Sequence, residues 1–131
     1  MMTLKNADVS AIEKFDKLLV QVIDQVIRYS LGDVNASIIY NYLEKRKCPL
    51  EDIPNNLEVF SMELRNLLGS GRGQILGSAI ILEKAILKAF CIKLGLKYNL
   101  EGPIVFADCI RELREAYNHG KQTALQSCHT Q

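Results

Sequence analysis

Apolar residues recur along the chain at the spacing of helices, and the clearest case lies between residues 10 and 31. Apolar positions there alternate at intervals of three and four residues, which places them on one face of a helix. Ser10 and Glu13 form a Ser-x-x-Glu capping box that predicts where this helix begins, and Gly32 predicts where it ends. The apolar seam consists of Ile12, Phe15, Leu19, Val22, Val26 and Tyr29.

Two shorter helices are predicted next. Asp33 is a candidate N-cap for a helix over 34–47, and Pro49 ends it because proline disfavours the helical conformation of the residue before it. A connector over 50–55 follows, and apolar residues at helical spacing predict a third helix over 57–68.

A fourth helix, predicted over 74–94, carries apolar residues on most of its faces. A helix of this kind is normally surrounded by its neighbours, so we expect it at the centre of the fold. Residues 96–101 alternate between apolar and polar, and we expect a docked loop there because no partner strand is evident. Pro103 predicts the first turn of a fifth helix, which Gly120 ends.

These elements predict an all-α fold, a single compact domain of about five helices around a central apolar helix. We expect the domain to cover residues 10–120, with a flexible N-terminus over 1–9 and a flexible polar tail over 121–131.

Composition and charge exclude several classes of protein. The 131 residues are 48% hydrophobic and 24% charged, as in ordinary globular domains. Sixteen Lys and Arg against fifteen Asp and Glu leave little electrostatic basis for a dedicated nucleic-acid binder. The longest apolar stretch is interrupted by charges and is too short for a membrane span, and the first ten residues lack the apolar segment of a signal peptide. We therefore expect a cytoplasmic chain with no membrane partner.

The chain offers little for catalysis or metal binding. Its two histidines, His119 and His129, lie at a predicted helix end and in the tail, and its carboxylates are spread over helix surfaces. The four cysteines form no C-x-x-C pair, and Cys91 and Cys109 lie within apolar helical patterns typical of buried thiols. We expect no enzyme, no metal and no cofactor.

The glycine-rich segment before the fourth helix is a candidate binding loop, formed by Ser70, Gly71, Arg72 and Gly73. A helix N-terminus favours anions, but the dinucleotide fingerprint needs a preceding strand that is missing here. Two interpretations stay open, a tight turn between helices and a contact with a phosphate or a partner.

The seam of the first helix is a candidate interface. Its alternation over about three heptads is typical of a helix that packs lengthwise on another. That neighbour is either a helix of the same domain or a partner chain, and for the second case the interface residues are Ile12, Phe15, Leu19, Val22 and Val26.

Turn and apolar positions within residues 12–117 resemble those of a known family. They are Asp33, Tyr40-x-Tyr42-Leu43-Glu44, Glu51-Asp52-Ile53-Pro54, Phe60-x-x-x-Leu64, Leu68-Gly69-x-Gly71 and Leu94-Gly95-Leu96. The pattern is similar to that of the Nitrosopumilus output domains, small archaeal helical domains that occur alone or attached to signalling modules. The resemblance implies an output role in archaeal signal transduction and supplies no catalytic residue.

The first hypothesis for function is thus a non-enzymatic regulatory or output module that binds a protein partner or forms a homodimer. An alternative is a small transcription-associated DNA-binding domain that uses Lys45, Arg46, Lys47 and Arg72. A third hypothesis is a phosphate-responsive domain centred on Ser70 and Arg72.

Overall fold

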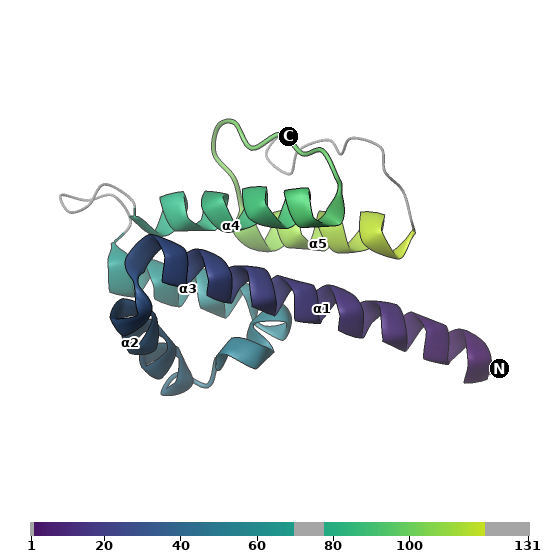
Figure 1. Cartoon of the computed structure of the whole chain (residues 1–131), viewed down its shortest axis with the longest axis horizontal. Helices are drawn as coiled ribbons and strands as arrows, with labels where there is room; N and C mark the ends of the chain where they lie inside the picture. Colours follow the sequence, from purple (N-terminus) through teal and green to yellow (C-terminus); the bar gives the residue numbers. More distant parts are fainter. Residues whose placement is uncertain (1, 70–77, 120–131) are drawn as a thin grey trace.

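The computed structural model (Figure 1) describes residues 2–69 and 78–119, with side chains over 13–69 and 79–119. The described residues form five α-helices and one short 3-10 helix, so the predicted all-α fold is confirmed. In chain order the elements are α1 (Met2–Leu31), α2 (Asp33–Glu44), η1 (Leu50–Asn55), α3 (Leu57–Leu68), α4 (Ser78–Leu94) and α5 (Phe106–Asn118).

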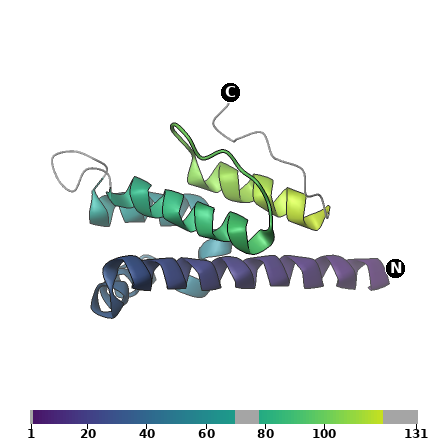
Figure 2. The same cartoon turned by 45° about the horizontal axis from the view of Figure 1, so that its top comes forward.

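The helix α4 contacts three helices, α1, α3 and α5, but it does not hold the predicted central position alone, because α1 also packs on α2, η1 and α5. Figures 1 and 2 show α1 and α4 side by side and running in opposite directions, with α5 next to α4. One face of α4 nevertheless stays open, because Ile81 and Ile92 are 62% and 72% exposed.

Four phenylalanines from four different helices anchor the core. The Phe15 ring on α1 meets the Phe90 ring on α4 edge-on, with centroids 5.0 Å apart, and Phe60 on α3 lies 5.7 Å from Phe106 on α5. All four are fully or almost fully buried. Edge-to-face and tilted pairs of this kind add to the stabilisation that burial provides. The core therefore joins helices that are far apart in the sequence.

The start of α1 differs from its prediction. The helix begins at Met2, so residues 2–9 are helical and the predicted capping box at Ser10 lies inside the helix. Neither glycine nor proline occurs over 2–9, so no helix breaker interrupts the helix there. The predicted end is confirmed, because Gly32 follows Leu31 with a φ of 90°, a left-handed value that suits glycine.

The helix α2 differs from its prediction at both ends. Its N-cap is Gly32 rather than Asp33, whose carboxylate instead accepts a hydrogen bond from Arg28 Nη1 at 3.0 Å. The helix ends at Glu44 instead of at residue 47, and Lys47 adopts a φ of 61° in the turn that follows.

The later elements follow the predictions more closely. The bounds of α3 are those predicted, and α4 ends at Leu94 as expected, while residues 74–77 of its predicted start lie outside the described residues. The loop that precedes α5 is docked on the core as expected, because Leu96 is buried there. The predicted helix start at Pro103 is wrong, because Ile104 packs against the core before α5 begins at Phe106. Gly120 and the tail of 121–131 lie outside the described residues.

Candidate functional site

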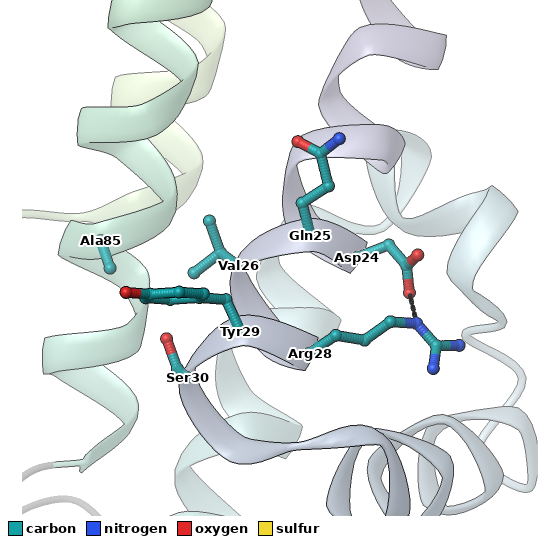
Figure 3. Close-up of a pocket in the computed structure, with 7 residues that line it drawn as sticks. All are labelled: Asp24, Gln25, Val26, Arg28, Tyr29, Ser30 and Ala85. Atoms are coloured by element: carbon teal, nitrogen blue, oxygen red, sulfur yellow. Dashed lines mark hydrogen bonds and ion pairs between the residues drawn. The ribbon is translucent and has the colours of Figure 1, made fainter.

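A surface groove lies between the C-terminal turns of α1 and the middle of α4 (Figure 3). Its volume is about 690 Å³. Six of the seven lining residues belong to the last two turns of α1, whereas α4 contributes one small side chain. The lining residues are Asp24, Gln25, Val26, Arg28, Tyr29, Ser30 and Ala85.

Large apolar side chains stand at the edges of this groove without being covered. The Tyr29 ring extends from α1 toward Ala85 of α4, and yet it is 93% exposed. Ile81 lies one turn before Ala85 on the same face of α4 and is also exposed. Alanine is too small to fill the space beside the tyrosine, so the groove stays open between the two helices.

The charged side chains of the groove are neutralised within the chain. Arg28 Nε lies 2.9 Å from Asp24 Oδ1, and its Nη1 pairs with Asp33. The Tyr40 hydroxyl donates a second hydrogen bond to Asp24 at 2.7 Å. Burial, together with this hydrogen bond, raises the pKa of the Tyr40 phenol above its usual value, which keeps the hydroxyl a donor. The Asp24 carboxylate is thus already engaged by Arg28 and by the Tyr40 hydroxyl.

A second polar cluster lies in the interior, between α3 and α4. The fully buried Glu83 carboxylate accepts hydrogen bonds from the Ser61 hydroxyl and from Arg65, whose Nη2 and Nη1 lie 3.2 and 3.3 Å from Oε1 and Oε2. Arg65 Nη1 also donates to the Ser61 hydroxyl oxygen. Burial raises the pKa of Glu83, and the Ser61 and Arg65 contacts oppose that rise. Because these side chains form hydrogen bonds with one another, the cluster holds α3 against α4.

Sequence reasoning missed this cluster, although one signal for it is present. Glu83 is the only carboxylate in the apolar helix α4, and a charged residue there needs a buried partner. Arg65 cannot be assigned as that partner from spacing, because it lies on a different helix.

The structure resolves the two interpretations of the first-helix seam in favour of packing within the domain. Phe15, Leu19 and Val22 are buried in the core, so they are not available as an interface between chains. The reason is that α4 and α5 cover this face of α1. Val26 is half-buried and lines the groove, whereas the side chain of Ile12 lies outside the described residues.

The other predicted binding residues differ in whether the structure describes them and in what they contact. The loop of Ser70, Gly71, Arg72 and Gly73 lies outside the described residues. In the basic triplet that follows α2, the Arg46 guanidinium stacks on the Tyr42 ring at 3.7 Å, and its Nε lies 3.3 Å from Glu63. The flanking Lys45 and Lys47 are exposed.

The cysteines bear out the expectation of buried thiols only in part. Cys48 and Cys91 are buried and free, and burial raises the pKa of the Cys91 thiol to about 11, so it stays protonated. Cys109 is also buried, but it is disulfide-bonded, so the prediction of a free thiol is wrong there.

Two kinds of feature are absent from the described residues. No group of three His, Cys, Asp or Glu side chains over 13–69 and 79–119 is placed to hold a metal ion. Within the described part of the chain, the helices lack the combination of length and apolarity that crossing a membrane requires.

Comparisons with protein families, with curated proteins and with solved structures find no match. The function of the protein is therefore inferred from the residues of this chain.

Proposed function

We propose that this chain is a non-enzymatic regulatory or output module that acts by protein–protein interaction through the groove between α1 and α4. The observation that carries the proposal is the exposure of Tyr29, which lines the groove, and of Ile81, which lies one helical turn before the groove residue Ala85. Exposed apolar groups that lie together mark interaction surfaces more often than single ones do. The role in archaeal signal transduction follows from the family resemblance of the sequence.

The chemistry of the groove supports contact with a protein. Tyrosine is enriched among the residues that dominate binding energy at interfaces, since its ring offers a large apolar area and its hydroxyl a hydrogen bond. Ile92 lies three turns beyond Ile81 on the same face of α4 and is itself exposed. The face of α4 that borders the groove thus carries an exposed isoleucine near each end.

The two other hypotheses draw less support from the described residues. A DNA-binding role would use Arg46, but this side chain is already engaged with Tyr42 and Glu63. The phosphate-responsive role depends on Ser70 and Arg72, which the structure does not describe.

The proposal is tested by comparing the wild-type chain with a Tyr29→Ser/Ile81→Ser variant. Light scattering over a range of concentrations measures self-association, and affinity capture followed by mass spectrometry identifies partners. A Val34→Ser/Met62→Ser variant is the control, because it removes two exposed apolar side chains that lie outside the groove.

We expect a dimer or a captured partner with the wild-type and control chains, and its loss with the groove variant. A monomer at every concentration, together with no partner whose capture depends on Tyr29 and Ile81, would contradict the proposal.

A further inference from the structure

The groove continues as a strip along the two neighbouring helices. On α4, the spacing of Ile81, Ala85, Lys88 and Ile92 places these residues on one face, and all of them are exposed or half-buried. Three turns of helix separate the first from the last, which is about 16 Å. This face of α4 is therefore long enough to receive a helix of three to four turns.

The adjacent face of α1 has the same length, with apolar side chains at its two ends and glutamines between them. Leu18, Gln21, Gln25 and Tyr29 are spaced to share one face, and each is exposed or half-buried. Gln25 and Tyr29 line the groove, which places this face beside α4. Since α1 and α4 lie side by side along their length (Figure 2), we name the two faces together the α1–α4 strip.

The charge of the α1–α4 strip has one sign. On α4 the strip contains Lys88, and Lys84 lies one turn before it at the edge of the strip. Neither lysine forms an ion pair with a described carboxylate. The one carboxylate of α4, Glu83, is buried on the opposite side of the helix. The nearest acid on α1 is Asp24, which Arg28 neutralises. The strip therefore combines an apolar floor with a positive edge.

This charge argues against a second copy of the chain as the occupant. In a two-fold interface the same patch meets itself, and the strip of one copy offers no unpaired described carboxylate to the lysines of the other. Like charges in an interface are unfavourable, whereas a partner with carboxylates would be attracted.

We infer that the α1–α4 strip receives an amphipathic helix from a partner protein, with an apolar stripe flanked by Asp or Glu. The stripe contacts Tyr29, Ile81 and Ile92, and the acidic flank meets Lys84 and Lys88. Laying an amphipathic helix into an apolar groove is a recurring mode of peptide recognition. The inference rests on the proposed function and adds the chemistry of the partner to it.

The test uses the full chain and three labelled helical peptides, with binding measured by fluorescence anisotropy. The first peptide carries an apolar stripe flanked by Glu, the second replaces each Glu with Lys, and the third is a scrambled version of the first without a stripe. We expect the first peptide to bind, and the other two to bind at least roughly tenfold more weakly.

Variants with reversed charges show where on the chain the acidic peptide binds. Lys84→Glu/Lys88→Glu is expected to weaken binding of the acidic peptide by roughly tenfold or more and to strengthen binding of the basic one. Lys45→Glu/Lys47→Glu is the matched control, because it changes the net charge equally at exposed lysines on the turn after α2. The control should leave the affinity of the acidic peptide nearly unchanged.

Several outcomes would overturn the inference. These are equal binding of the scrambled peptide, an equal effect of the two charge reversals, no binding of the acidic peptide, or a dimer that Tyr29→Ser/Ile81→Ser abolishes. The last result would make a second copy the occupant. If the acidic peptide does not bind while capture still depends on Tyr29 and Ile81, the inference fails and the proposed function stands. If capture and dimerisation also fail, both are wrong.

Discussion

The buried ion pair between α3 and α4 leads to the most demanding prediction, the effect of Arg65→Met. The substitution keeps much of the apolar stem but removes the guanidinium, and Glu83 then retains the Ser61 hydroxyl as its remaining described donor. Removing one partner from a fully buried ion pair costs about 3–5 kcal/mol, because the other charge is left uncompensated. Here 33% of the Arg65 side chain is exposed, and the resulting screening lowers the expected cost to about 2–3 kcal/mol.

The loss is measured by urea unfolding followed by circular dichroism, with linear extrapolation to water. For a domain of this size, it corresponds to a fall in melting temperature of about 8–12 °C. The matched control is Arg111→Met, which removes a guanidinium paired with Glu58 and Asp108 at the surface. We expect that variant to change stability little, because water screens exposed ion pairs.

A double variant separates the effect of charge on stability from the effect of side-chain shape. Arg65→Met/Glu83→Leu removes both charges, so it should be more stable than Arg65→Met alone. The reasoning is refuted if Arg65→Met loses no more stability than Arg111→Met. It is equally refuted if the double variant is no more stable than Arg65→Met, because the cost would then not come from an uncompensated carboxylate.

Two further predictions concern the pH dependence of stability and the core. Because burial raises the folded-state pKa of Glu83 above its ordinary 4.5, this group contributes stability below that value and loses it as pH rises through the folded pKa. Unfolding at several pH values should therefore show Glu83→Gln gaining stability relative to wild type as pH rises, and a flat or falling difference would contradict this. Phe90→Ala should cost about 3–5 kcal/mol in urea unfolding, because it empties a fully buried site against Phe15. The exposed Ile92→Ala is its control, and an equal loss in both would show that Phe90 is not packed as described.

The helices themselves could be predicted with fair accuracy because their signals are local. The bounds of α3 follow from apolar residues at helical spacing, and Gly32 and Gly95 end their helices with left-handed φ values. Two predictions fail because local signals are not specific to helix starts. The capping box at Ser10 predicts a helix start but lies inside α1, and Pro103 predicts the first turn of α5, which begins only at Phe106. Both residue patterns also occur away from helix starts.

The candidate site could not be predicted because its exposure depends on neighbours. Tyr29 continues the apolar seam of α1 in the sequence and would be expected in the core with Phe15 and Leu19. In the structure it is 93% exposed, because the facing position on α4 is Ala85, which is too small to cover it. No pattern within α1 carries the identity of that facing residue.

The sequence by itself determined the all-α class, most helix ends and the apolar character of α4, because backbone hydrogen bonds and helical periodicity act over a few residues. Only the tertiary structure decided which face of each helix is covered. It buried Phe15 and left Tyr29 open, and it placed Arg65 against Glu83 from another helix. Burial and ion pairing depend on contacts between segments distant in the chain, and these contacts define the groove from which the function is proposed.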